Sequence, residues 1–296
     1  MGITLKRLII LGLGILAGIL VWPFVELLIV LQVHFPSFLI FSIAMGALFG
    51  GIFGAVYGTG EGIIASSRRR IIRGVLTGFV TGFVGGIVGF LIGQWVLFLL
   101  GQYLFISYRN FTYFGLPIAR AAGWAVTGIF IGIIEGIRAG SNKKIGIGVL
   151  GGFLGGLLGG AVIEYSRLLI NNYALSRLIS FIVFGASIAA FYALIERKMS
   201  YGVLRILNGP FKGREYILNS TVIRIGLDEK NDIVLKPYRH VAPVHSVIRA
   251  VGDELVIEKG EGTASVFLND EMVKEKVLKY EDVIKIGSAK FYYRHE

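Results

Sequence analysis

The sequence predicts a multi-domain protein in which an all-α transmembrane helical bundle of about six helices, with internal hairpin repeats, is followed by an all-β sandwich. The 296 residues are 54% hydrophobic with a mean hydropathy of +0.71, which is too apolar for two ordinary soluble domains. Residues 1–200 hold 34 of the 42 glycines and 20 charged residues, whereas residues 201–296 hold 29 charged residues in less than half the length. We therefore predict a glycine-rich transmembrane domain at 1–200 and a soluble domain at 201–296.

Residues 1–200 contain six apolar stretches that approach or exceed the roughly 20 residues a helix needs to cross a bilayer. They lie at about 7–32, 37–59, 72–105, 117–137, 145–169 and 177–196. The first stretch is too long for a secretory signal and lacks a small-residue cleavage site, so we interpret it as a retained helix. The lipid bilayer is thus the first predicted partner.

The charges that flank these stretches predict the orientation of the chain. One side receives eleven cations: Lys6, Arg7, Arg68, Arg69, Arg70, Arg73, Arg138, Lys143, Lys144, Arg197 and Lys198. The other side receives Arg109, Arg120, Arg167 and Arg177. By the positive-inside rule, the richer side is cytoplasmic, which places both termini and residues 201–296 in the cytosol.

The transmembrane part repeats itself at a shift of 74 residues, which lays Glu61 and Gly62 on Glu135 and Gly136 and continues through many glycines. Glycines also recur every four residues, a spacing that lets helix backbones approach closely. Two such stripes are Gly46, Gly50, Gly54 and Gly58, and Gly148, Gly152, Gly156 and Gly160. These glycine zippers predict a tight bundle or a homo-oligomer.

Acidic side chains within the apolar stretches raise a second functional hypothesis. Glu26 and Glu164 lie toward the outer ends of the first and fifth predicted helices, where an ionisable group is costly. They are the candidates for an ion or proton pathway, with the glycine stripes as a sliding interface. Glu61, Glu135 and Glu196 fall near cytoplasmic helix ends, where we expect an interfacial role.

From Tyr201 onward, short β-rich runs such as Val203 to Leu207 and Thr221 to Ile225 alternate with turns such as Asn208-Gly209-Pro210. Many short strands at this spacing predict a β-sandwich. The order of residues resembles the forkhead-associated (FHA) domain, a β-sandwich that typically recognises phosphothreonine peptides through loops at one end. The matching segments are 207–216, Ile225-Gly226, 231–235, His245, 266–270, Leu278, 282–287 and Phe291.

The departures from the FHA pattern fall on its phosphate-binding positions. Leu227 replaces the usual arginine after the Ile-Gly pair, and Ala242 replaces the usual serine three residues before His245. A charge-assisted phosphate contact is lost with that arginine. The resemblance implies that His245 is structural and that Asn269 orients a peptide backbone, although Asp270 stands where the family has glycine. We therefore predict a degenerate FHA domain without standard phosphothreonine binding.

Two functional hypotheses follow. In the first, the chain is a membrane anchor, scaffold or signalling component whose cytosolic FHA-like domain binds a protein or peptide partner, with Arg224, Arg239, His240 and Asn269 as loop contacts. In the second, it is a small transporter or channel regulated by that domain. The FHA-like tail and the topology predict a prokaryotic inner or plasma membrane.

Several function classes are not expected. The four histidines lack HExxH spacing, there is no GxxxxGK[ST] loop, and the chain has no cysteine, so we predict no enzyme, no cofactor and no metal site. Positive residues flank apolar runs and do not cluster on one soluble face, so nucleic acid is not a predicted partner.

Overall fold

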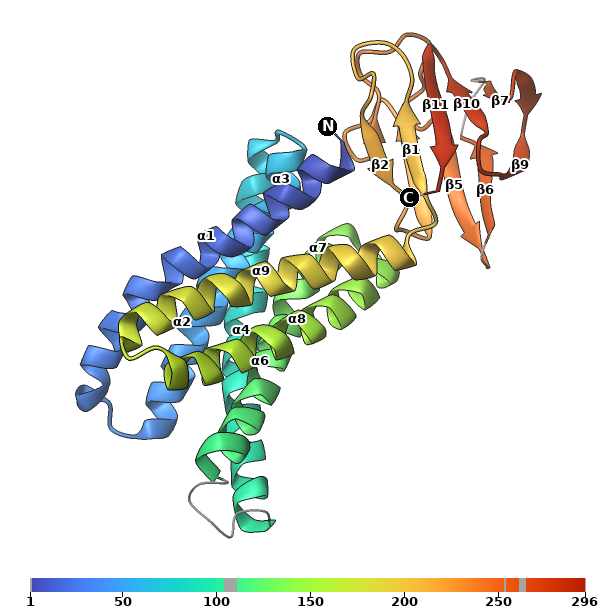
Figure 1. Ribbon diagram of the computed structural model, residues 1–296. Helices are drawn as coiled ribbons and strands as arrows, with labels where there is room; N and C mark the ends of the chain where they lie inside the picture. The colour runs from blue at the N-terminus through green and yellow to red at the C-terminus, as the bar shows by residue number, and fades with distance from the viewer. Residues whose placement is uncertain (1, 104–110, 253, 261–264, 296) are drawn as a thin grey trace. The chain divides into compact units, whose positions relative to one another are not determined.

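The computed structural model describes residues 2–103, 111–252, 254–260 and 265–295 (Figure 1). Packing divides the chain into two compact units. Arg7–Ile195 form a helical unit, and Met1–Lys6 together with Glu196–Glu296 form a β unit. The predicted fold class, a helical bundle followed by a β-sandwich, is confirmed.

Long helices make up the first part of the chain. The described helices are α1 (Ile3–Val30), η1 (Leu31–His34), α2 (Phe38–Gly58), α3 (Gly60–Ile64), α4 (Arg68–Tyr103), η2 (Phe111–Gly115), α6 (Leu116–Gly132), α7 (Ile134–Ala139), α8 (Asn142–Leu169) and α9 (Tyr173–Met199). In the described part of the chain, six stretches are long and apolar enough to cross a membrane: Ile3–His34, Phe38–Ile64, Arg68–Leu99, Tyr113–Ala139, Asn142–Arg167 and Tyr173–Met199.

Side-chain caps fix where two of these helices begin. The hydroxyl of Ser37 accepts the Ile40 N–H at 3.3 Å ahead of α2, and the hydroxyl of Ser141 accepts the Lys144 N–H at 3.4 Å ahead of α8. Each cap satisfies a backbone donor that the first helical turn leaves without a partner. Gly140, with φ +58°, ends α7 in the left-handed conformation that glycine adopts without strain.

The glycine stripe on α2 packs against a glycine stripe on α4. A Cβ atom added to any of these glycines would lie under 3.0 Å from backbone atoms of the opposite helix: Gly46, Gly50, Gly54, Gly58, Gly74, Gly78, Gly82 and Gly86. Such close approach replaces the hydrophobic driving force that is missing in lipid. Because both stripes lie in the same chain, this contact needs no oligomer.

Positions 74 residues apart make the same contacts in two helical hairpins. Gly54 faces Gly78 between α2 and α4, as Gly128 faces Gly152 between α6 and α8. Gly14 of α1 also meets Gly185 of α9, so the first and last helices of the helical unit approach through glycine as well. These two helices run side by side in Figure 1.

Aromatic side chains fill the middle of the helical unit. Phe49 lies at the centre of this cluster, with ring centroids 4.5 Å from Phe53, 4.8 Å from Trp124, 5.2 Å from Phe181 and 5.5 Å from Phe184. All five side chains are buried, and most pairs meet edge to face, the geometry aromatic rings prefer. We call these five residues the aromatic layer.

The β unit is a sandwich of two sheets. Its strands are β1 (Val203–Ile206), β2 (Glu215–Ile217), β3 (Val222–Gly226), β4 (Ile233–Val234), β5 (Ser246–Val251), β6 (Glu254–Lys259), β7 (Val266–Leu268), β8 (Glu271–Val273), β9 (Glu275–Leu278), β10 (Val283–Ile286) and β11 (Ala289–Arg294). One sheet has the order β2-β1-β11-β10-β7-β8, and the other has the order β4-β3-β5-β6-β9. The β3–β4 pair is parallel, and the other paired strands with a described register are antiparallel.

Alternation along the strands builds the core between the two sheets. In β3, Val222 and Arg224 are exposed while Ile223 and Ile225 are buried, which follows the two-residue period of a strand. Fully buried Phe291 of β11 belongs to the core on the opposite sheet. This core holds the loops of the sandwich in place.

The N-terminal residues pack into the β unit. The backbone N–H of Ile3 donates to Glu215 Oε2 at 3.1 Å, and Lys6 Nζ lies 3.1 Å from Glu196 Oε1. Glu196 also accepts a hydrogen bond from Asn219 Nδ2 at 2.7 Å. Both ends of the chain therefore contribute to one folded unit.

Candidate functional site

Four connections meet at one end of the sandwich, which we call the loop end. They are the loops 207–214, 227–232 and 235–245 and the turn 287–288. Leu227 N–H donates to the Ala242 carbonyl at 3.0 Å, and Ser288 N–H donates to the Arg239 carbonyl at 3.0 Å. The hydroxyl of Tyr238 donates to the Asn208 carbonyl at 2.7 Å. The loops therefore form one connected surface.

Arg239 and His240 are exposed side by side on this surface. The N–H of Arg239 donates to Ser288 Oγ at 3.0 Å, so the β10–β11 turn fixes the backbone that carries both side chains. His240 has φ +59°, a conformation that is uncommon outside glycine and concentrates at functional positions. Sequence reasoning missed Ser288; the only signal was its place after Gly287 in a tight turn.

The phosphate-binding positions of the FHA pattern offer no charged donor here. Leu227 is half-buried and packs against the sandwich core. Ala242 is half-buried, and its backbone N–H donates to His245 Nδ1 at 3.1 Å. Neither side chain can donate a hydrogen bond to a phosphate oxygen.

The His245 ring is buried and is hydrogen-bonded through both of its nitrogens. Its side chain is 1% exposed, its Nδ1 accepts the Ala242 N–H, and its Nε2 lies 3.1 Å from the Ser265 carbonyl. Because Nδ1 accepts, the ring carries its proton on Nε2, which donates to Ser265. The ring thereby ties the β4–β5 loop to the start of β7.

The structure places Asn269 away from the loop end. Asn269 follows β7 beside Val283, at the start of β10, whereas Arg239 contacts the turn that follows β10. The four residues of β10 separate them by about 13 Å. The Asn269 amide donates to Asp282 Oδ1 at 2.7 Å and accepts the Val283 N–H at 2.8 Å.

Asp270 occupies a left-handed backbone position, where glycine would be favoured. Asn269 and Asp270 have φ values of +50° and +66°, the pattern of the two-residue hairpin turn that favours glycine at its second position.

Arg224 is exposed in the middle of β3, and its backbone N–H donates to Asp232 Oδ2 at 2.8 Å. Arg239 and His240 are neighbours on the loop end, and the Arg224 backbone is tied to Asp232 of the loop 227–232.

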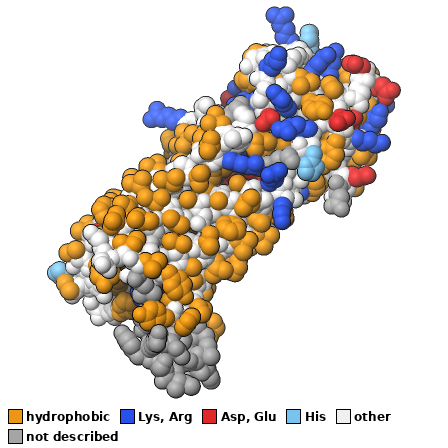
Figure 2. All heavy atoms as spheres, in the orientation of Figure 1, with side chains coloured by type: hydrophobic (Ala, Val, Ile, Leu, Met, Phe, Trp, Pro, Cys, Tyr) orange, Lys and Arg blue, Asp and Glu red, His pale blue; other side chains and the backbone are white. Residues whose placement is uncertain are grey.

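Cations prevail around the loop end. Lys212, Arg239 and Lys290 are exposed there, and Lys236 Nζ pairs with Glu229 Oε1 at 2.5 Å. Figure 2 shows Lys and Arg side chains gathered on the visible face of the β unit, whereas hydrophobic side chains cover the visible face of the helical unit.

The two predicted intramembrane carboxylates are both ion-paired. Arg177 holds Glu26 with two hydrogen bonds, at 2.6 Å from Nε and 2.7 Å from Nη2. Glu164, only 4% exposed, accepts from Arg120 Nη1 at 3.2 Å and from Trp124 Nε1 at 3.4 Å. Pairing lowers the cost of burying each carboxylate.

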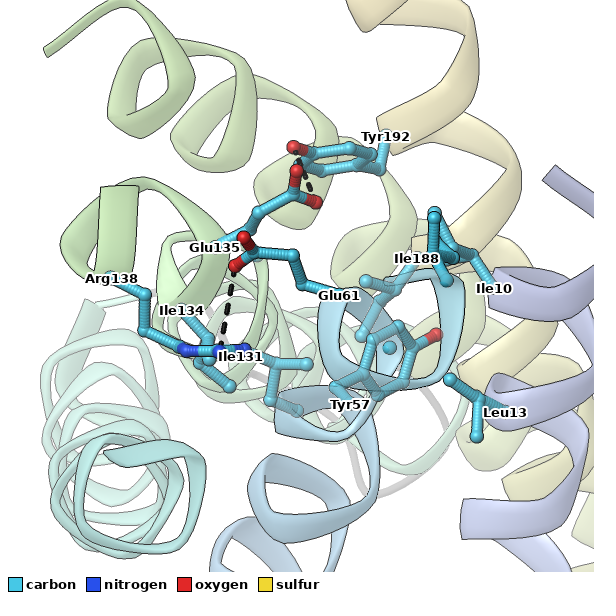
Figure 3. A pocket seen from close by; sticks show the side chains of 13 residues that line it. Ile10, Leu13, Tyr57, Glu61, Ile131, Ile134, Glu135, Arg138, Ile188 and Tyr192 are labelled. Carbon is cyan, nitrogen blue, oxygen red and sulfur yellow. Dashed lines mark hydrogen bonds and ion pairs between the residues drawn. The ribbon is translucent and has the colours of Figure 1, made fainter. Parts of the chain in front are cut away.

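Glu61 and Glu135, which the sequence predicts near cytoplasmic helix ends, also form ion pairs at repeated positions. Glu61 Oε1 lies 3.4 Å from Arg70 Nη1, and Glu135 Oε1 lies 3.5 Å from Lys144 Nζ, at positions shifted by 74 residues. Arg138 adds a contact of 3.5 Å to Glu61, as Figure 3 shows.

Glu61, Glu135 and Arg138 line a small cavity of about 40 Å³ together with apolar side chains. Tyr192, which also lines it, donates from its hydroxyl to Glu135 Oε2 at 3.2 Å. No group of three or more metal-binding side chains occurs among the described residues. Ion pairs and the Tyr192 hydrogen bond therefore engage the charged side chains that line this cavity.

Comparison with known proteins locates the relatives of the β unit. Residues 205–296 match the family described as "Inner membrane component of T3SS, cytoplasmic domain". No curated protein matches the chain.

Solved structures similar to this part of the chain include an FHA domain studied for phosphothreonine-dependent interactions, with 26% identity over 32% of this chain and 95% of that chain and a TM-score of 0.29. The FhaA FHA domain, crystallised with the intracellular domain of Rv3910, is 27% identical over 31% of this chain and 98% of that chain, with a TM-score of 0.29. The cytoplasmic domain of the T3SS sorting platform protein PscD from P. aeruginosa is 18% identical over 31% of this chain and 78% of that chain, with a TM-score of 0.29.

The two-sheet sandwich and the family match agree in extent, since the match begins in β1 and runs through β11. Residues 205–296 are therefore an FHA-like domain, and the helices before it include six stretches that are long and apolar enough to span a membrane.

Proposed function

We propose that this chain is a membrane-anchored scaffold whose FHA-like domain binds a cytosolic protein or peptide through its loop end, without requiring phosphothreonine. The observation that carries this proposal is the combination of an intact loop surface with apolar residues, Leu227 and Ala242, at the phosphate-binding positions. The matched family describes a membrane component, which supports a non-enzymatic role.

Arg239 and His240 are the proposed central contacts. Both are exposed, and Ser288 fixes their backbone, so little conformational entropy is lost when a partner orders them. Arg224 offers a further cation on the exposed face of β3. Asn269 acts in this proposal through the shape of the β7–β8 turn, because its amide is engaged by Asp282 and Val283.

The proposed location is a prokaryotic inner or plasma membrane with both termini in the cytoplasm. The uneven distribution of Lys and Arg supports this orientation. The chain has no cysteine, so single cysteines introduced by Asn172→Cys and Lys212→Cys report on each side without background. An impermeant maleimide added to intact spheroplasts should label the first variant only; labelling of the second would overturn the orientation.

Peptide binding tests the phosphate prediction. Full-length protein in detergent is titrated with a degenerate phosphothreonine peptide library and with the same library after dephosphorylation. We expect no large preference for the phosphorylated form, since no charged donor occupies the phosphate position. A strong preference that is abolished by Arg239→Ala would contradict the proposal.

Site-specific cross-linking tests the surface itself. A photo-reactive amino acid is placed at His240 and, as a matched control, at Tyr280, which is exposed at the opposite end of the sandwich. A discrete cross-linked protein from position 240, lost in an Arg239→Ala background and absent from position 280, supports the loop end. Equal products from both positions would place the contact elsewhere.

A transporter or channel is the second candidate. One observation favours it: the helical unit has a cavity on each side of the aromatic layer, the small one beside Glu61 and Glu135 and a larger one of about 410 Å³ beside Glu164 and Arg177. Ion or proton flux into sealed vesicles, compared with a Glu26→Gln, Glu164→Gln double variant, tests it. Absence of flux in both proteins would remove this candidate.

A further inference from the structure

The larger cavity of the helical unit has about 410 Å³ of space, which lies within the range of small-molecule binding sites. Side chains from α1, α2, α4, α6, α8 and α9 line it. Most are apolar, including Phe41, Met45 and Phe49 of α2 and Phe181 of α9. Gly89 and Gly93 of α4 also face it, so part of the wall carries no side chain at all.

Polar groups of the cavity gather at its outer end. Arg120 lies four residues after the start of α6, Arg177 four residues after the start of α9, and Glu164 five residues before the end of α8. Phe49 is eleven residues into α2 from Phe38, which corresponds to a depth of about 16 Å. The cavity thus has a charged mouth and an aromatic floor.

The mouth carries an excess of positive charge. Arg120, Arg167 and Arg177 face two carboxylates, Glu26 and Glu164, and the other three acidic residues of 1–200 lie in the cytoplasmic ends of the helices. Among the described contacts, the Arg120 side chain gives one N–H to Glu164. A guanidinium has five N–H donors, so Arg120 retains donors for an anion.

We propose that this cavity binds a single-chain anionic amphiphile, with its acyl chain along the apolar wall from Phe41 to Phe49 and its phosphate or carboxylate at Arg120 and Arg177. The apolar wall excludes a fully polar ligand, because it would leave such a ligand's donors and acceptors without partners. The excess cation at the mouth favours an anionic headgroup over a zwitterionic one.

Native mass spectrometry of the full chain in detergent tests the proposal. Oleoyl lysophosphatidate is compared with oleoyl lysophosphatidylcholine, which has the same chain and a zwitterionic headgroup, and with inorganic phosphate. We expect one lysophosphatidate per protein, bound at least about tenfold more tightly than the choline lipid. Inorganic phosphate should not displace it. Equal affinity for the two lipids, or displacement by phosphate alone, would overturn the proposal.

Matched variants locate the bound lipid. Ser42→Trp fills the cavity from its wall and should abolish binding, whereas Leu39→Trp, on the exposed side of the same helix, should leave it intact. Arg120→Gln should remove the headgroup preference, and the exposed Arg73→Gln should not. Lipid binding that survives Ser42→Trp refutes the site.

A second variant separates loss of the headgroup preference from misfolding of the Arg120→Gln protein. Arg120→Gln together with Glu164→Gln leaves no buried carboxylate without its guanidinium, so this double variant should fold as the parent does. It removes one cation and one anion together, so the excess charge of the mouth is unchanged, and the preference for lysophosphatidate should fall through the loss of the Arg120 donors. If the preference persists in the folded double variant, the headgroup does not bind at Arg120.

Discussion

Replacing Gly54 with alanine tests whether backbone contact between α2 and α4 holds the helical unit together. A Cβ at Gly54 would come under 3.0 Å from the Gly78 carbonyl and 2.9 Å from Gly82 Cα. Both obstacles are backbone atoms, so no side-chain rotation can make room. The helices must therefore move apart by about 1 Å.

This separation sets the size of the effect. A gap of about 0.5–1 Å already forfeits a quarter to a half of the dispersion energy of the atoms it parts. Overpacking a filled site costs about 1–3 kcal/mol, and an obstacle made of backbone places Gly54→Ala toward about 2–3 kcal/mol. The repeat makes a further prediction: Gly128→Ala, whose Cβ would approach Gly152 in the same way, should destabilise by a similar amount.

Thermal unfolding in detergent, followed by helical circular dichroism, measures the change. Gly146→Ala is the matched control, because a Cβ there would have no atom within 4 Å apart from its chain neighbours and the backbone of its own helix. Alanine has the higher helix propensity, so this control should be neutral or slightly stabilising. If Gly54→Ala and Gly146→Ala shift the unfolding midpoint in the same direction and by the same amount, glycine packing does not hold these helices together.

Three further predictions concern the β unit. Burial raises the pKa of Glu215, but hydrogen bonds from the Ile3 N–H and Arg294 outweigh this effect, so its pKa lies below the ordinary 4.5. The ionised carboxylate therefore stabilises the fold above pH 4.5, and this stabilisation is lost as the pH falls through the lowered pKa. Glu215→Gln should accordingly flatten the acid limb of a curve of unfolding free energy against pH. His245→Ala removes a buried ring with its two hydrogen bonds and should cost about 2–4 kcal/mol in chemical denaturation. A loss below about 0.5 kcal/mol would contradict its proposed structural role. Asp270→Gly relieves a left-handed conformation and should stabilise by about 0.5 kcal/mol, which differential scanning calorimetry can detect; a clear loss of stability would mean that the carboxylate has a partner.

Local sequence patterns determined the two fold classes. Apolar stretches of bilayer length, strand alternation and turn residues act over a few neighbouring positions, so they identify helices and strands without knowledge of the rest of the chain. The FHA pattern likewise predicts His245 as structural, and the structure buries its ring, with Nδ1 accepting the Ala242 N–H. The sequence alone also shows that Leu227 and Ala242 depart from the phosphate-binding residues of the FHA pattern.

The tertiary structure decided which distant residues meet. Glu26 pairs with Arg177 across 151 positions and Glu164 with Arg120 across 44, and neither pairing has a local signal. The FHA pattern predicts Asn269 as a loop contact, but Asn269 lies at the opposite end of β10 from the turn that Arg239 contacts. Pairings of this kind arise from the packing of whole helices and sheets, whose relative placement no short window of sequence encodes.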